Sequence, residues 1–273
     1  MSIERQAAPT RKPERRRSAI AKADEAASGS SAERSLKLLS LLANQGRALP
    51  LAELAGLLGL PKATAHRICT QLLAGGYLSR DVDERSFNVG PALRQLAFDA
   101  LNHGVVRGLR HTVLSELVEQ VGETCNFTTL DGTEVLYLDR VEAQWPLRLT
   151  LDVGSHVPMH CTASGKLFLA QMAPGVRDTV IANLPLTRMT RNTIVSAKAL
   201  RAECERIAEQ GYSLDREEFI AGLIAVAVPV RGGDDAARAA IAVHAPVARM
   251  TLDGAVKQLP ALQAAAKRMR ALL

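Results

Sequence analysis

Several features that would mark a secreted, membrane or metal-binding protein are missing from this sequence. Its four cysteines lie far apart and form no CxxC motif, which predicts buried, reduced thiols rather than a disulfide framework or a zinc site. No apolar run approaches the roughly 18 residues of a membrane span. The charged N-terminus is not followed by the apolar core of a secretory signal. We therefore expect a cytoplasmic protein with no membrane partner, no metal and no cofactor.

Positive charge is present in excess, but it is unevenly placed along the 273 residues. The formal net charge is +6, and residues 1–80 alone hold 13 Lys and Arg against 6 Asp and Glu. A basic end joined to a longer, nearly neutral segment indicates a polyanion-binding domain attached to a domain with another role. A solvated basic tail without a partner is the alternative that charge alone leaves open.

The first third of the chain has the pattern of a small helical domain behind a tail. Residues 1–32 are rich in Ala, Ser, Pro and Arg without apolar periodicity, so we expect a disordered basic tail. Residues 33–91 contain three short helical patterns and then two short strands around a charged turn. This order predicts a winged helix-turn-helix, which places its third helix in the major groove of DNA. A small helical bundle with a charged face is the structural alternative.

The third helix, "PKATAHRICTQLLA", divides into an apolar face and a polar face. Ala65, Ile68 and Leu72 share the apolar face, which leaves side chains toward solvent that can contact phosphates and base edges. Two arginines are expected on the wing. The predicted DNA-binding residues are therefore Lys62, Thr64, His66, Arg67, Thr70, Arg80 and Arg85.

The rest of the chain mixes strands and helices. A linker helix is expected over residues 92–108, and residues 109–273 are expected to form one domain. In this domain, two alternating runs joined by Asp131-Gly132 predict a β-hairpin. "LRLTLDVG", "LIAVAVPV" and "AAIAVHAPV" are further predicted strands, while "SGKLFLAQM", "SAKALRAECERIAEQG" and "LPALQAAAKRMRALL" are predicted helices. The predicted fold class is α+β with an antiparallel sheet.

The segment "HVPMHCTASGKLFLA", which begins at His156, suggests several chemistries that its spacing does not support. A phosphate loop would need a Gly five residues before Gly165 and a Ser or Thr after the lysine. A serine nucleophile would need GxSxG around Ser164. Pro158 interrupts any helical metal pair of His156 and His160. Adjacent His and Cys residues rarely have the geometry of a thiol–base pair.

One physical feature of this segment remains. "CTASG" opens an apolar helix with small residues, and the first amides of a helix have no partner within it. Small side chains let a ligand approach these amides, so a carboxylate could bind there without any catalytic residue. An ordinary Ser/Thr helix cap with no ligand explains the same residues equally well.

The sequence resembles the IclR family of bacterial transcriptional regulators over about residues 32–273. The matching motifs, in chain order, are "LPKATAHRICTQLLAGGYL", "FNVG", "HVPMHCTASGKLFLA" and "QGYSLDREEFIAGLIAVAVPV". The resemblance implies an N-terminal winged helix-turn-helix, a linker helix and a C-terminal GAF-like effector domain. It also implies a non-enzymatic repressor or activator that binds double-stranded operator DNA as a homodimer or dimer of dimers. Its effector would be a small carboxylic acid from a catabolic pathway.

The resemblance also implies which residues surround the effector. In chain order, they are two positions that line the wall of the pocket, two amides at the start of a helix, one acidic position and three positions on the last two strands. These effector-binding positions are Leu149, Val157, Ala163, Ser164, Asp215, Ala225, Ala242 and His244.

Three of these positions depart from the family's pattern. Members that bind small acids often have Cys where Ala225 stands, and Ser where Ala242 and His244 stand. The chain therefore favours a bulky or aromatic carboxylate, with His244 as one polar contact. A small keto or hydroxy acid, with water in place of the lost side chains, is the alternative. Two other hypotheses are an enzyme that uses Asp215 with His244, and a constitutive architectural DNA-binding protein.

Overall fold

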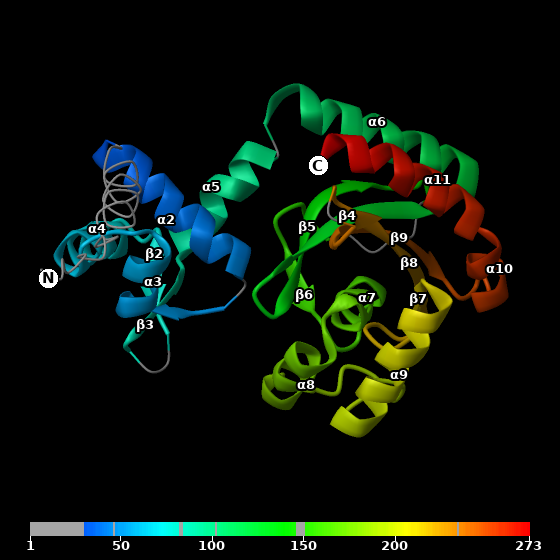
Figure 1. Ribbon diagram of the computed structural model, residues 1–273. Coiled ribbons are helices and arrows are strands. Elements are labelled where there is room, and N and C mark those ends of the chain that lie inside the picture. The colour runs from blue at the N-terminus through cyan, green and yellow to red at the C-terminus, as the bar shows by residue number, and fades with distance from the viewer. Residues whose placement is uncertain (1–29, 46, 82–83, 102, 146–150, 234) are drawn as a thin grey trace, which may run out of the picture. The chain divides into compact units, whose positions relative to one another are not determined.

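The computed structural model describes residues 30–273 except 46, 82–83, 102, 146–150 and 234. The chain divides into two compact units, Met1–Ala97 and Phe98–Leu273 (Figure 1). Nearly all of the predicted disordered tail lies outside the described residues. None of the helices in the described ranges is both long enough and apolar enough to cross a membrane.

The N-terminal unit is a winged helix-turn-helix, as predicted. Its helices are α2 (Ser31–Gln45), α3 (Leu51–Leu57) and α4 (Lys62–Ala74), and its strands are β1 (Leu49–Pro50), β2 (Leu78–Arg80) and β3 (Ser86–Val89). The strands pair antiparallel in the order β1-β3-β2, so β2 and β3 form the wing. The strand β1 was not predicted, because two residues are too short to show an alternating pattern. Fully buried leucine, isoleucine and phenylalanine side chains hold the helices to this sheet: Leu38, Leu42, Leu54, Ile68 and Phe87.

Two helices follow the winged unit, where the sequence predicted a linker helix over residues 92–108. They are α5 (Pro91–Leu101) and α6 (Gly104–Val121). The two helices are separated at Gly104, whose φ of 72° is strained for any residue with a side chain. The long helix begins at that glycine, so residues 104–108 belong to α6.

The C-terminal unit is built on one antiparallel sheet, as predicted. Its described strands lie in the order β6-β5-β4-β9-β8-β7. They are β4 (Thr124–Asp131), β5 (Glu134–Val141), β6 (His156–Pro158), β7 (Ser213–Arg216), β8 (Leu223–Arg231) and β9 (Ala237–Pro246). The hairpin is β4–β5, and Gly132 has the left-handed φ of 62° that its tight turn requires.

The strand predicted for "LRLTLDVG" is wrong in its described part. Residues 151–152 form no regular structure, residues 153–154 form a turn, and residues 147–150 lie outside the described residues. The strand lies slightly later in the chain, at β6. Among the residues that the structure describes, this strand pairs with β5 alone, and Pro158, which has no amide hydrogen to donate, ends it.

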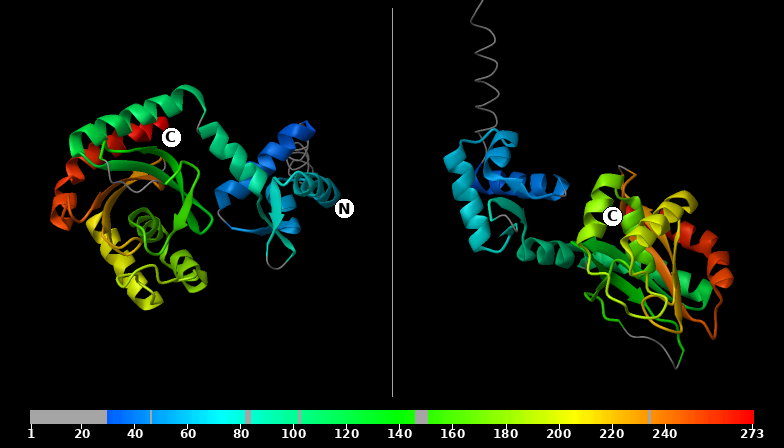
Figure 2. Two further views of the ribbon diagram at one scale, coloured as in Figure 1. Left: turned by 180° about the vertical axis from the view of Figure 1, so that it is seen from behind. Right: turned by 90° about the horizontal axis from the view of Figure 1, so that it is seen from below.

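Helices cover both faces of the sheet (Figure 2). The helices α6, α10 (Leu252–Lys257) and α11 (Leu259–Met269) pack on one face. The helices α7 (Ala163–Gln171), α8 (Pro174–Asn183) and α9 (Ala197–Gln210) pack on the other. Because β8 and β9 are buried on both faces, their sequences are continuous apolar runs. The elements α8, α10 and β7 were not predicted.

Candidate functional site

Helix α4 presents most of its predicted polar face to solvent. Ala65, Ile68 and Cys69 are buried against the winged unit, so Cys69 rather than Leu72 completes the buried face. The Thr70 hydroxyl donates to a backbone carbonyl one turn back (3.0 Å). Thr64 is half-buried, and the exposed candidates on this helix are Lys62, His66, Arg67 and Thr70.

The wing carries the two other candidate arginines. The Arg80 guanidinium lies 4.4 Å from the centre of the Phe87 ring and donates to the Glu84 carbonyl oxygen (3.0 Å). Arg85 is exposed at the start of β3. The roles of these residues in DNA contact stay predictions.

Helix α7 begins at Ala163 with Thr162 as its N-cap. The Thr162 hydroxyl accepts a hydrogen bond from the Gly165 amide (3.2 Å) and donates one to the Pro158 carbonyl oxygen (2.8 Å). Among the described residues, the amides of Ala163 and Ser164 have no acceptor. They lie at the positive end of the helix dipole. The ordinary cap and the two unpaired amides therefore coexist, so the two interpretations of this segment do not exclude each other.

Close backbone packing fixes the start of α7. A Cβ atom at Gly165 would lie 2.2 Å from the Met159 carbonyl oxygen and 2.5 Å from its Cα. Only glycine permits this approach, because no side chain could move to relieve the contact. The glycine of the Gly-Lys pair therefore serves the packing of α7 against the preceding turn.

Three of the predicted effector positions form a row across neighbouring strands. Asp215 on β7 pairs with Ala225 on β8, which pairs with His244 on β9. Ala242 lies two residues before His244 and therefore on the same face of β9. Asp215, Ala225 and Ala242 are buried and His244 is partly exposed, on the face that α7 and α9 cover.

Of the two positions predicted to line the wall of the pocket, Val157 lies within the described residues. Val157 is buried on β6, opposite Val135 on β5, and packs in the same apolar cluster as Ala163. This cluster joins the helix start to the sheet. Leu149 lies outside the described residues.

The buried carboxyl group of Asp215 has a pKa well above its ordinary value. Its Oδ1 accepts hydrogen bonds from the amides of Glu218 (2.7 Å) and Phe219 (3.4 Å). Burial raises the pKa of Asp215 to about 7, although these amide donors and the Lys166 ammonium favour the charged form. The carboxyl group is therefore shared between its two protonation states near neutral pH.

His244 and Asp215 lie on strands that are not adjacent in the sheet. Ala225 stands between them in the sheet register, so two strand spacings, about 10 Å, separate their backbones. Burial, and to a lesser degree the positive charge of Arg140, lower the pKa of His244 to about 3, which leaves the imidazole neutral. A general base must lie within hydrogen-bond reach of its partner group. This arrangement does not support an enzyme built on the pair.

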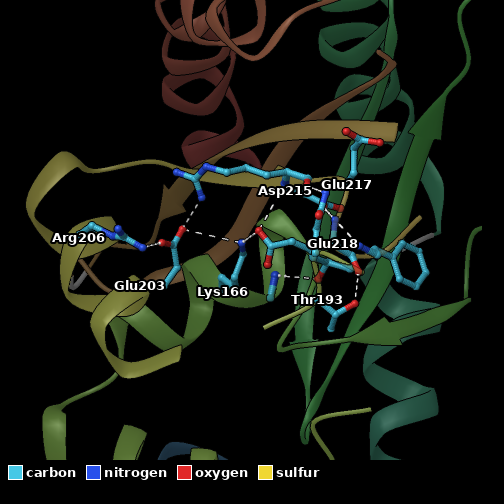
Figure 3. A network of polar contacts seen from close by, with 12 residues as sticks. Lys166, Thr193, Glu203, Arg206, Asp215, Glu217 and Glu218 are labelled. Carbon is cyan, nitrogen blue, oxygen red and sulfur yellow. Dashed lines mark hydrogen bonds and ion pairs between the residues drawn. The ribbon is translucent and has the colours of Figure 1, made fainter. Parts of the chain in front are cut away.

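A buried ion network explains the lysine of the Gly-Lys pair. Figure 3 shows the Lys166 ammonium between the carboxylates of Glu218 and Glu203, and the Lys166–Glu203 distance is 3.8 Å. All three side chains are almost completely buried. Glu203 also accepts from Arg216 (2.8 Å) and Arg206. Lys166 thus links α7 to α9 and to the segment after β7.

The other reactive side chains of the segment have separate structural partners. His156 Nε2 lies 2.9 Å from Asp131 Oδ2, whereas His160 Nε2 lies 2.8 Å from the Thr187 carbonyl oxygen. Burial raises the pKa of Cys161 to about 12, which opposes formation of a thiolate. The four cysteines are free and buried, as predicted. The described residues contain no cluster of three or more His, Cys, Asp or Glu suited to a metal ion.

Family models match both units of the chain. A model described as the IclR helix-turn-helix domain matches residues 31–82. A second, described as the C-terminal domain of the bacterial transcriptional regulator IclR, matches residues 98–271. The chain belongs to the IclR family. It is therefore a transcriptional regulator of the IclR type, with a helix-turn-helix unit and a C-terminal effector-binding domain.

IclR-family relatives align over most of both chains. Probable transcriptional regulator SauR of Cupriavidus necator is 43% identical over 242 residues, which are 89% of this chain and 96% of the relative. Transcriptional repressor IclR of Escherichia coli is 30% identical over 240 residues, which are 87% and 88% of the two chains. These relatives are named as regulators of transcription and not as enzymes.

Solved structures of the IclR family have the same fold. One is the crystal structure of an IclR homolog from Microbacterium hydrocarbonoxydans complexed with 4-hydroxybenzoate. It matches with a TM-score of 0.56 and 25% identity, over 89% of this chain and 99% of that chain.

Two inward-facing residues of this IclR-family chain were missed by the sequence reasoning. Asn126 on β4 lies opposite Ala242, and Arg140 on β5 lies opposite Asn126. The Arg140 side chain is 6% exposed and donates to Asn126 Oδ1 (2.9 Å). The sequence contained a signal for Asn126. Alternate residues of a strand lie on opposite faces, so in "TCNFT" Thr124 and Asn126 share one face while the apolar Cys125 and Phe127 share the other.

Proposed function

We propose that this protein is a one-component regulator that binds operator DNA through its winged unit, under control of a small carboxylic acid bound by its C-terminal unit. The observation that carries the proposal is the start of α7. The amides of Ala163 and Ser164 have no acceptor among the described residues, and Ala163 packs in the same apolar cluster as the predicted effector positions Val157, Ala225 and Ala242. Such amides bind a carboxylate through hydrogen bonds and the helix dipole.

The side chains around this helix start favour an acid with a bulky or aromatic body. Alanine stands at positions 225 and 242, and the face they share also carries Ala227 and Ala240. Short apolar side chains offer few hydrogen bonds to a heavily oxygenated acid and suit contact with an apolar ligand body. Neutral His244 adds one polar contact at the end of the row. The IclR homolog complexed with 4-hydroxybenzoate is a relative whose ligand has this character.

Calorimetric titration of the full-length protein tests the ligand class. The panel contains benzoate and 4-hydroxybenzoate as aromatic acids, and glyoxylate and pyruvate as small keto acids. We expect the aromatic acids to bind at least about tenfold more tightly, which corresponds to about 1.4 kcal/mol. Binding of glyoxylate or pyruvate without binding of the aromatic acids would establish the small keto acid alternative instead.

On the DNA side, the exposed basic face of α4 supports groove binding. A dimer or dimer of dimers of winged units would recognise half-sites about one helical turn, or a simple multiple of it, apart. The acid changes operator affinity only as far as the two DNA-binding conformations bind it differently. Operator binding measured with and without the tightest acid of the panel is expected to differ. Identical DNA affinities at saturating acid would remove the acid from the regulatory mechanism.

A further inference from the structure

Asn126 carries a buried hydrogen-bond donor that the fold does not use. The side chain is completely buried in the middle of β4. Arg140 Nη1 donates to Asn126 Oδ1, and because a guanidinium can only donate, this contact fixes which end of the amide is oxygen. Asn126 Nδ2 has no acceptor among the described residues. A buried donor without an acceptor is costly, so it requires an explanation.

The surroundings of this amide are apolar on the side away from Arg140. Asn126 pairs directly with Ala242 on β9, whose other neighbour on the same face is Ala227 on β8. Alanine methyl groups cannot accept a hydrogen bond. The donor therefore lies next to a predicted effector position and faces alanine methyl groups across β9 and β8, and the buried hydroxyls of Thr124 and Thr128 on its own strand do not accept from it.

The charges near Asn126 favour an uncharged acceptor. Arg140 Nε already forms an ion pair with Glu142 (3.3 Å), so the guanidinium charge is partly balanced before any ligand binds. An anionic ligand group would lose its hydration here without gaining the full charge of Arg140 in return, which costs free energy. A carbonyl oxygen accepts from an amide donor without that cost.

We propose that Asn126 Nδ2 donates a hydrogen bond to an uncharged carbonyl oxygen of the effector, at the end of the ligand away from its carboxylate. This inference rests on the proposed function, in which the amides of Ala163 and Ser164 hold the carboxylate. The effector class is therefore an oxo acid whose ketone or amide carbonyl is separated from the carboxylate by an apolar body. Arg140 is a positioning residue that keeps the Asn126 amide in the donating orientation.

Isosteric pairs of acids test the proposal on the full-length protein. One pair is 4-acetylbenzoate and 4-isopropylbenzoate, and the other is 4-oxopentanoate and 4-methylpentanoate. Within each pair a carbonyl oxygen is replaced by a methyl group of similar size. For the pair that fits the site, calorimetry is expected to show about tenfold tighter binding of the ketone, since only the ketone satisfies the buried donor.

The variant Asn126→Asp separates this contact from general fit. It retains an oxygen that accepts from Arg140 but replaces Nδ2 with a second oxygen, which repels a ligand carbonyl. We expect the preference for the ketone over its methyl analogue to fall below about twofold. The ratio of the two affinities is the readout, because the added carboxyl group acts on both ligand carboxylates alike. The control is Asn183→Asp, at an exposed asparagine of α8 whose amide donates to the Thr179 carbonyl oxygen. This control is expected to keep the full preference.

The outcomes distinguish the inference from the proposal beneath it. Equal affinities of ketone and methyl analogue in the wild-type protein, or a preference that survives Asn126→Asp, overturn the role of Asn126 and leave the carboxylate site standing. Failure of all four acids to bind a protein that binds operator DNA overturns the carboxylate site and the inference together. If Asn126→Asp does not fold, the wild-type comparison still tests the proposal, because equal affinities of ketone and methyl analogue overturn it.

Discussion

Replacement of Ala163 by proline would remove one amide donor from the start of α7 and leave the helix intact. Proline is well tolerated at the first helical position, where the helix does not use the amide hydrogen. The residue before a proline must be extended, and Thr162 already is, with φ −105° and ψ 152°. A hydrogen bond to a charged group contributes about 1.5–3 kcal/mol. We therefore expect Ala163→Pro to weaken binding of the carboxylate effector by about tenfold to a hundredfold.

The assay is calorimetric titration of the full-length variant with whichever acid binds the wild-type protein most tightly. The matched control is Ala197→Pro, which makes the same change at the first position of α9 after the extended N-cap Ser196. Ala197→Pro should leave the affinity for the acid unchanged. A folded Ala163→Pro protein that binds the acid as tightly as the wild type would refute the assignment of the carboxylate to this helix start.

Three further variants test other parts of the argument. Arg67→Ala should weaken operator binding. If Arg67 contacts a phosphate, the slope of log affinity against log salt should fall by about one unit; if it contacts a base, binding should lose about 1–3 kcal/mol at one base pair. Unchanged affinity at fixed salt would contradict the predicted recognition face. Asp215 has a pKa raised to about 7, so the folded protein keeps a proton that the unfolded chain loses above about pH 4. The wild type should therefore lose stability as the pH rises from about 4 to 7, and urea unfolding should show a flatter dependence for Asp215→Asn; equal slopes would contradict the raised pKa. Lys166→Met leaves Glu218 and Glu203 without their buried partner and should cost about 3–5 kcal/mol in urea unfolding, with partial recovery when Glu218→Gln is added; a loss below about 1 kcal/mol would contradict the buried network.

Local patterns in the sequence were sufficient for much of the fold. The period of α4 predicted that Ala65 and Ile68 are buried, because a helix repeats every 3.6 residues wherever it packs. The Asp131-Gly132 pair predicted the β4–β5 hairpin, because the turn itself needs a glycine. In both cases the information lies within a few residues of the element that it specifies.

The environment of the site depended on contacts between distant residues and could not be predicted in the same way. The burial of Lys166 depends on Glu218, which lies 52 residues later in the chain. The fixed orientation of the Asn126 amide depends on Arg140, across a hairpin. The strand β6 was placed too early because its three residues, His156–Pro158, are too few to show an alternating pattern.

The sheet order has a consequence for the order in which this protein folds. The strand β4 pairs with β9, so residues 124–128 contact residues 240–244 near the end of the chain. Such distant contacts slow folding, because the intervening chain must be ordered before they form. The winged unit needs only contacts within the first 97 residues. During synthesis, the part that reads DNA can therefore fold while the strand that carries Ala242 and His244 has not yet been made.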